Sequence, residues 1–256
     1  MDLEKLLFSK NEKPLDNLVW DGGYARVFRT IGCIGDSLSS GEHESRMDGE
    51  TGYHDYYEYS WGQYMARNAG INVFNFSRGG MTARQFMEGF GEKCGVWTDA
   101  KKCQAYILAL GVNEVYQNQE LGELSDVDPE HPENNKDTFV GNYAKIISKL
   151  KTIEPDAKFF LITIPRGELG EQGDRHAELL YGLKDMFENT YIIDLRKYGP
   201  EYNDEFKKRF YVGGHMSAAG YILSAQMITS YLDYIVRHNI EDFAQAGFIG
   251  TPYKFI

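Results

Sequence analysis

The sequence predicts an α/β fold with a parallel central sheet, and two observations lead to that prediction. Short apolar segments of strand length alternate with longer segments of helical period, which favours βαβ units. Several apolar segments also break directly into polar, glycine-bearing turns. The expected strands cover 31–34, 71–76, 105–110, 158–164 and 191–195. With 256 residues, 42% of them hydrophobic, the chain is long enough for one sizeable core, so we expect one domain.

The segment that orders the rest of the chain is TIGCIGDSLSSG, residues 30–41. Its β-branched residues predict a buried strand that ends in a tight turn at Gly35-Asp36-Ser37-Leu38. Ser37 is then presented at the carboxyl end of the strand, the edge where open α/β sheets bind ligands. A serine at this position is a candidate nucleophile, provided that a base and an oxyanion hole reach it.

Composition excludes some classes of partner. The net charge is −11 and the pI is near 5.1, which argues against binding to nucleic acid or to an anionic membrane surface. Three cysteines without a paired spacing fit a reducing compartment. We see no apolar segment of signal-peptide or membrane-spanning length, and therefore expect a cytoplasmic protein.

Three segments show no clear helical or strand pattern. The sequence of residues 1–28 predicts an arm that packs on a domain spanning 29–256, with aromatic anchors that include Trp20, Tyr24 and Phe28. Residues 42–59 hold two histidines near carboxylates, but no common ligand spacing, so a solvated loop is expected rather than a metal site. Residues 121–137 are acidic and proline-bearing, and predict a surface loop or a flap over a cleft.

Two later turns could contribute oxyanion donors. Gly79 and Gly80 lie in a turn between a strand and a helix, where paired glycines permit an unusual backbone and expose N–H groups. Asn113 follows the expected strand 105–110, and its amide could reach into a cleft at the sheet edge. Taken one at a time, both positions are more typical of ordinary turns.

His215 precedes an expected helix whose N-cap would be Ser217 and whose apolar face includes Tyr221, Ile228 and Leu232. The positive end of the helix dipole disfavours imidazolium, so we expect a neutral histidine that is ready to act as a base. For the residue alone, a capping or packing role is the simpler interpretation.

Ser37, Gly80, Asn113 and His215 would all lie at the same edge of a parallel sheet. Together they would supply a nucleophile, a backbone N–H, a side-chain N–H donor and a base, which acyl transfer through a tetrahedral oxyanion requires.

At these positions the chain resembles the SGNH hydrolases, also called the GDSL esterase/lipase family. The resemblance comprises four blocks in family order: Gly35-Asp36-Ser37-Leu38, Asn75 to Thr82, Gly111-Val112-Asn113 and His215 to Tyr221. It implies a flavodoxin-like three-layer α/β/α sandwich with about five parallel strands. It also implies that Ser37 is the nucleophile, that His215 is the base, and that Ser37, Gly80 and Asn113 form the oxyanion hole, with no cofactor or metal.

The resemblance has one departure. The family usually places an aspartate three residues before the histidine, and here that position is Val212, whose side chain cannot accept a hydrogen bond. Another carboxylate could serve, the candidates being Asp204, Glu205, Glu42 and Glu114. A backbone carbonyl near Val212 could instead orient His215, or the site could be degenerate.

The resulting hypothesis is a serine esterase of short-acyl esters, acetyl first, on a carbohydrate, similar to the carbohydrate acetyl esterases. Trp97, Tyr116 and the tyrosines between 53 and 59 could line a sugar-binding cleft, although aromatic side chains more often belong to the core. The alternatives are a thioesterase or lysophospholipase that uses the same site, and a non-catalytic binding module. The substrate would be a small-molecule or oligosaccharide ester; the oligomeric state is open.

Overall fold

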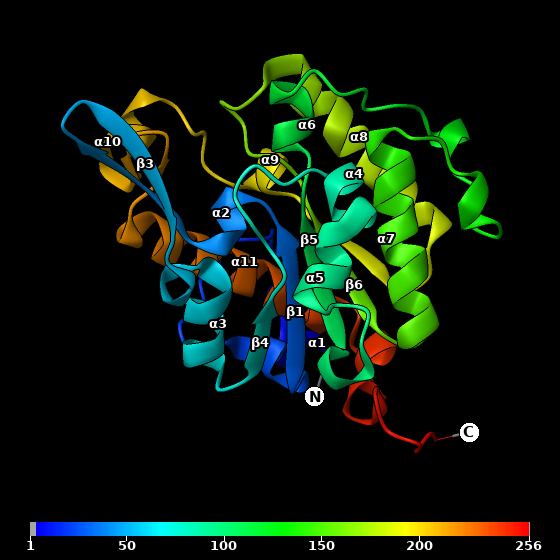
Figure 1. Ribbon diagram of the computed structural model, residues 1–256. Helices are drawn as coiled ribbons and strands as arrows, with labels where there is room; N and C mark the ends of the chain where they lie inside the picture. Colours follow the sequence, from blue (N-terminus) through cyan, green and yellow to red (C-terminus); the bar gives the residue numbers. More distant parts are fainter. Residues whose placement is uncertain (1–3, 256) are drawn as a thin grey trace.

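A five-stranded parallel sheet forms the centre of the computed structural model, which describes residues 4–255 (Figure 1). The strand order is β4-β1-β5-β6-β7. The strands are β1 (Thr30–Gly35), β4 (Asn72–Asn75), β5 (Ala105–Ala109), β6 (Lys158–Ile162) and β7 (Thr190–Ile193). Every neighbouring pair is parallel, which confirms the expected fold class.

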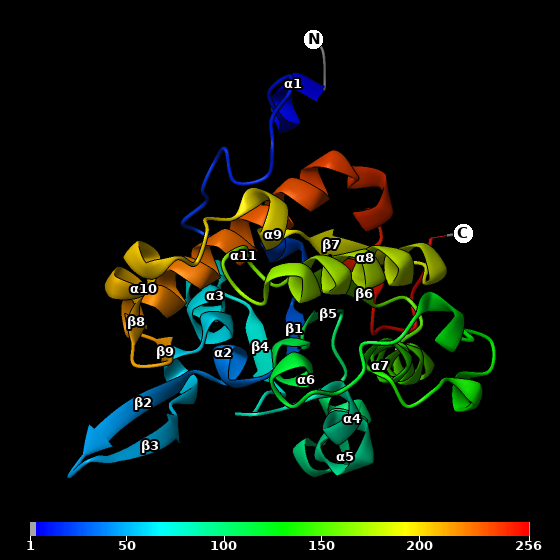
Figure 2. The same cartoon turned by 90° about the horizontal axis from the view of Figure 1, so that it is seen from above.

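The strands are buried because helices cover both faces of the sheet (Figure 2). The helices are α1 (Glu4–Leu7), α2 (Ser37–Ser40), α3 (Trp61–Ala69), α4 (Ala83–Gln85), α5 (Gly91–Cys94), α6 (Val112–Tyr116), α7 (Phe139–Ile153), α8 (Gly170–Met186), α9 (Leu195–Tyr198), α10 (Asp204–Phe210) and α11 (Ala218–His238). Helices α3 and α11 pack on one face, and α4, α7 and α8 pack on the other. The three-layer α/β/α sandwich is therefore confirmed.

Short 3₁₀ and π segments connect these elements. The 3₁₀ segments are Gly23–Val27, Tyr57–Tyr59, Asp99–Lys101, Leu124–Asp126, Pro132–Asn134, Ile240–Phe243 and Ala246–Phe248, and the π segment is Phe86–Phe90. Residues 121–137 contain two of these turns and no longer element, as expected of a loop.

The expectation of a solvated loop over 42–59 is wrong. Strands β2 (Glu42–Met47) and β3 (Glu50–Asp55) form an antiparallel hairpin that projects from the body of the molecule (Figure 2). Asp48 and Gly49 close its turn with φ values of 53° and 83°, the left-handed conformation that Asp-Gly turns adopt in hairpins. Both faces of the hairpin are polar or aromatic, so the alternation that identifies a half-buried strand is missing.

The N-terminal arm contacts α11, but two of its expected anchors are wrong. Phe28 is buried, whereas Trp20 is 66% exposed and Tyr24 is 37% exposed. A charged contact holds the arm instead, because Arg237 on α11 donates to both carboxylate oxygens of Glu12. The first three residues of the proposed 1–28 arm lie outside the described residues.

Between residues 4 and 255, no helix is long and apolar enough to cross a membrane.

Candidate active site

Strand β1 and helix α2 present Ser37. The strand ends at Gly35, and Asp36 caps α2 by accepting the N–H of Leu38 on Oδ1 at 3.0 Å. Ser37 is therefore the first residue of the helix and lies at the carboxyl end of the central strand, as the sequence predicts. The backbone carbonyl of Ser37 accepts a hydrogen bond from the hydroxyl of Tyr221 at 3.2 Å, which ties the turn to α11.

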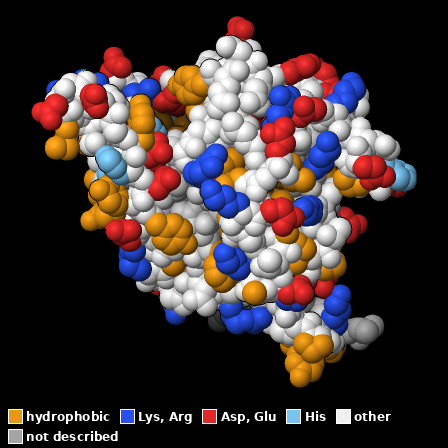
Figure 3. Space-filling model, in the orientation of Figure 1, with side chains coloured by type: hydrophobic (Ala, Val, Ile, Leu, Met, Phe, Trp, Pro, Cys, Tyr) orange, Lys and Arg blue, Asp and Glu red, His pale blue; other side chains and the backbone are white. Residues whose placement is uncertain are grey.

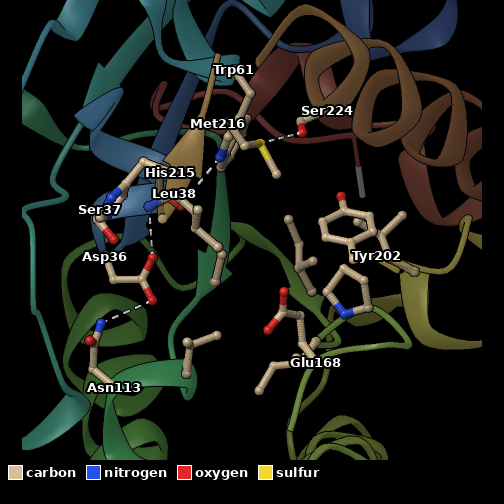
Figure 4. A pocket seen from close by; sticks show the side chains of 18 of the residues that line it. Asp36, Ser37, Leu38, Trp61, Asn113, Glu168, Tyr202, His215, Met216 and Ser224 are labelled. Atoms are coloured by element: carbon tan, nitrogen blue, oxygen red, sulfur yellow. Dashed lines mark hydrogen bonds between the residues drawn. The ribbon is translucent and has the colours of Figure 1, made fainter. Parts of the chain in front are cut away.

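His215 lies close to this turn although it is far away in the sequence. It begins the short strand β9 (His215–Met216), which pairs with β8 (Tyr211–Val212). Strand β9 packs against α2, and Ser37 and His215 line the same cavity of about 430 Å³ (Figure 4). The structure thus brings the proposed nucleophile and the proposed base to one site.

Asn113 lines the same cavity from α6. Its Nδ2 donates to Asp36 Oδ2 at 3.2 Å and to Met81 O at 3.3 Å, so its amide is aimed at the nucleophile turn (Figure 4). Gly80 belongs to the adjoining loop and has a φ of 71°, the left-handed region that favours glycine. Its carbonyl accepts Gln117 Nε2 at 3.0 Å, which fixes this loop to the end of α6.

The cavity reaches inward from Ser37 along the carboxyl ends of β5 and β6. Its inner wall is mainly apolar and includes Leu38, Trp61, Leu110, Ile162, Ile164, Leu195, Met216 and Ile228. Its polar wall includes Tyr202 and an ion pair in which Lys207 Nζ lies 2.8 Å from Glu168 Oε1.

Glu42, from the first position of β2, is hydrogen-bonded to His215. The imidazole Nε2 lies 2.9 Å from Glu42 Oε1, and both side chains are largely buried. This hydrogen bond raises the pKa of His215 above its ordinary value, and burial only partly opposes it. The sequence predicts that the helix dipole lowers the pKa of His215, but the pKa is raised instead, because a carboxylate in contact outweighs the end of a helix that begins three residues later.

Two further carboxyl groups lie beneath the site. Burial raises the pKa of Asp36 to about 7, although the N–H of Leu38 and the charge of His215 oppose this. Burial also raises the pKa of Glu114 to about 7. Glu114 Oε1 accepts the backbone N–H of Ala83 at 2.6 Å, so this side chain joins α6, which holds Asn113, to α4, which follows Gly80.

Sequence reasoning missed Glu44, which faces His215 from the same strand as Glu42. Its Oε2 lies 3.9 Å from His215 Nδ1 and accepts the N–H of Gly214 at 2.5 Å. The Asp-Gly dipeptide at 48–49 was the available signal. It predicts a hairpin, and alternation along β2 then places Glu42 and Glu44 on one face.

Trp97 is not part of the site. It packs edge-on against Phe86 at 5.7 Å between ring centroids and lies under the ammonium of Lys149, so the expectation that it lines a sugar cleft is wrong. Tyr116 lines the cavity and is 64% exposed, and the Tyr53 ring lies 5.4 Å from that of His215.

The histidines of the hairpin have protein partners. His43 Nδ1 lies 3.0 Å from Gly41 O, and His54 Nε2 lies 2.8 Å from Ser45 Oγ. Within residues 4–255, no group of three or more His, Cys, Asp or Glu side chains is arranged to hold a metal ion.

Comparison with known proteins identifies a family. The model of the GDSL-like lipase/acylhydrolase family matches residues 33–223, which include Ser37, Gly80, Asn113 and His215. A search of curated protein sequences found no match.

Solved structures share the fold. A family two carbohydrate esterase from Clostridium thermocellum, in complex with cellohexaose, is 17% identical with a TM-score of 0.59, covering 91% of this chain and 67% of its own. A family 3 carbohydrate esterase from the same organism is 15% identical with a TM-score of 0.54, covering 82% and 97%. A lipolytic protein of the G-D-S-L family from Desulfitobacterium hafniense is 16% identical with a TM-score of 0.52, covering 79% and 99%.

Proposed function

Because the chain belongs to the GDSL-like lipase/acylhydrolase family, and is therefore a carboxylic ester hydrolase, we propose that it works as a serine esterase through Ser37 and His215. The observation that supports this most directly is that Ser37, Asn113 and His215 line one cavity. Val212 does not prevent such chemistry, since carboxylates of β2 lie beside the imidazole.

In the proposed reaction, His215 takes the hydroxyl proton of Ser37 while Ser37 Oγ bonds to the acyl carbon. The N–H groups of Ser37 and Gly80 and the amide of Asn113 stabilise the oxyanion. One N–H of Asn113 must turn from Asp36 to the substrate for this. Collapse of this tetrahedral intermediate breaks the ester C–O bond, and the alcohol leaves with the proton that His215 returns. Water then adds to the acyl carbon while His215 takes one of its protons. The second tetrahedral intermediate breaks the bond between Ser37 Oγ and the acyl carbon, Ser37 Oγ recovers the proton from His215, and the acid leaves.

We propose a carbohydrate alcohol with a short acyl group, acetyl first. Hydrophobic and histidine side chains are exposed on the hairpin beside the site (Figure 3). Met47 and Tyr53 of the hairpin are exposed, as is Tyr56 directly after it. Aromatic faces suit sugar rings; Tyr116 lines the cavity and the Tyr53 ring packs beside His215, which supports a sugar in this region. Two structural neighbours are named as carbohydrate esterases, which agrees with this proposal.

A second candidate is hydrolysis of longer acyl esters or thioesters, as a lysophospholipase or thioesterase would perform. The apolar inner wall favours it, because Ile162, Ile164 and Ile228 could cover an acyl chain. We retain the acetyl ester as the first proposal because the cavity wall also contains Tyr202 and the Glu168–Lys207 ion pair. A long alkyl chain would have to pack against these polar groups, which is unfavourable.

The test compares kcat/KM for 4-nitrophenyl acetate, butyrate and octanoate, and for an acetylated cello-oligosaccharide, with Ser37→Ala as control. We expect acetyl to be preferred and Ser37→Ala to be inactive but folded. A strong octanoate preference would transfer the assignment to the second candidate. Full activity of Ser37→Ala would overturn the proposed mechanism. Absence of Ser37 labelling by a fluorophosphonate would indicate a non-catalytic binding module.

A further inference from the structure

The two imidazole nitrogens of His215 have different surroundings. Nε2 is hydrogen-bonded to Glu42, whereas Nδ1 is buried and has no hydrogen-bond partner. A general base must pass its proton to an alcohol that departs through the open cavity, and a fully buried nitrogen cannot reach it. Nε2 is therefore the nitrogen that can serve as the base, and Nδ1–H needs an acceptor to hold the ring and stabilise imidazolium.

The carboxylates named from the sequence do not fill this role. Glu205 is exposed and pairs with Arg209 at 2.5 Å, and Asp204 is exposed at the start of α10. Glu114 is bound to the N–H of Ala83, and Glu42 contacts the other nitrogen. Within the described part of the chain, the carboxylates within 4.0 Å of His215 are Glu42 and Glu44.

Glu44 stands on the Nδ1 side of the ring. Its Oε2 lies 3.9 Å from Nδ1, and its side chain is 11% exposed. The turn before His215 is shaped around this carboxylate. Gly214 donates its N–H to Oε2, and a Cβ at Gly213 would lie 2.3 Å from Glu44 Cδ. A side chain at Gly213 would also require a φ of 64°, so both space and conformation favour glycine here.

We propose that Glu44 is the positioning carboxylate of His215. The hairpin would thus supply the carboxylate that is missing at position 212, where this chain has a valine. This inference rests on the proposed function. Catalytic hydrogen bonds are often long before substrate binds, and a small rotation of the ring or of the carboxylate brings Oε2 within reach of Nδ1–H. Glu42 and Asp36 are the other charged groups near the imidazole, and the Tyr53 ring packs against it from β3.

The experiment measures 4-nitrophenyl acetate hydrolysis and fluorophosphonate labelling of Ser37 in Glu44→Gln. The amide oxygen can still accept the N–H of Gly214 while the charge is lost. The matched control is Glu50→Gln, at an exposed position on the same hairpin. We expect kcat to fall on the order of 100-fold or more with KM within about threefold. We also expect slower labelling of Ser37. The acidic limb of the pH profile should move to lower pH, because losing a negative charge near His215 lowers the pKa of the imidazole.

A second variant separates positioning from turn structure. In Glu44→Ala, adding Val212→Asp places a carboxylate opposite His215 on the paired strand β8, and we expect it to restore at least tenfold in kcat. Wild-type kcat in Glu44→Gln, or a change in KM alone, would overturn the role of Glu44 while leaving Ser37 as the nucleophile. If Ser37→Ala retained activity, the proposed function itself would fail, so the two failures are distinguishable.

Discussion

Glu42 Oε1 lies 2.9 Å from His215 Nε2, the nitrogen that would receive the proton of Ser37 in the proposed mechanism. In that mechanism Glu42 would compete with the nucleophile for the base and would stabilise the charged imidazole. Its other oxygen reaches the oxyanion loop, because a Cβ on Gly79 would lie 1.9 Å from Oε2. The carboxylate thus lies between the base and the loop that holds Gly80.

Glu42→Gln tests this competition. The hydrogen bond to Glu42 raises the pKa of His215, and a general base must be neutral to work, so we expect the acidic limb of kcat/KM to lie above the ordinary histidine pKa. Removing the charge lowers the pKa of His215, and the limb moves to lower pH. The pH profile of 4-nitrophenyl acetate hydrolysis measures this, with Glu50→Gln as the unshifted control. A limb that stays in place or moves to higher pH would contradict the assignment.

Gly79→Ala tests the contact between Glu42 and His215 by a change in the loop that faces Glu42 Oε2. The added methyl group must displace Glu42 Oε2, since 1.9 Å is far below any real contact. We expect the pKa of His215, followed by NMR of the imidazole, to fall in the same direction as in Glu42→Gln. An unchanged pKa would show that Glu42 Oε1 keeps its hydrogen bond to His215 even when the methyl group displaces Oε2.

Asn113→Ala removes the proposed side-chain donor of the oxyanion hole. We expect kcat to fall on the order of 100-fold with little change in KM, because the lost hydrogen bond acts in the transition state. Steady-state kinetics on 4-nitrophenyl acetate give both constants. Glu120→Gln, at an exposed position outside the cavity, is the matched control and should retain wild-type kinetics. Equal rates in the two variants would remove Asn113 from the oxyanion hole.

Glu114→Gln should change how stability depends on pH. Burial raises the folded-state pKa of Glu114 to about 7, above its ordinary value of 4.5, so the folded protein binds the proton more tightly than the unfolded chain. The stabilising contribution is complete below about pH 4.5 and is lost as pH rises through about 7, by at most roughly 3 kcal/mol.

Urea unfolding at pH 4.5, 6 and 7.5 measures that effect. We expect the free energy of unfolding of wild type, relative to Glu114→Gln, to decrease across this range. Asp36 titrates in the same window and its charge also raises the pKa of Glu114, so the difference reports Glu114 together with its coupling to Asp36. A difference that is constant with pH would mean that Glu114 does not titrate as proposed.

The sheet was predictable because its central strands are largely apolar runs, as expected of a parallel sheet covered on both faces. The positions of Ser37 and Asn113 follow from this, since each comes directly after a strand and parallel strands share one carboxyl edge. Ser217 was likewise predictable as an N-cap, and its side chain accepts the N–H of Gly220.

The hairpin was not recognised because neither of its faces is buried in a core, so it shows no alternation of apolar and polar residues. Its proposed role depends on contacts between Glu44 and the turn at Gly213 and Gly214, far along the chain, and the spacing of Glu44 in the sequence does not reveal them. The direction in which the pKa of His215 shifts could not be predicted for the same reason. The dipole of α11 is a local feature of the sequence, whereas the Glu42 contact forms only on folding.

The hairpin also has a consequence for how such a site could be altered. The proposed nucleophile and both carboxylates beside the imidazole come from one short stretch, Ser37 to Glu44, while the segment before His215 supplies only glycines and a backbone N–H. The segment before His215 therefore does not need to supply a carboxylate. Its exposed position at Val212 is open to variation, and it could be remodelled to admit different alcohols without rebuilding the proton relay.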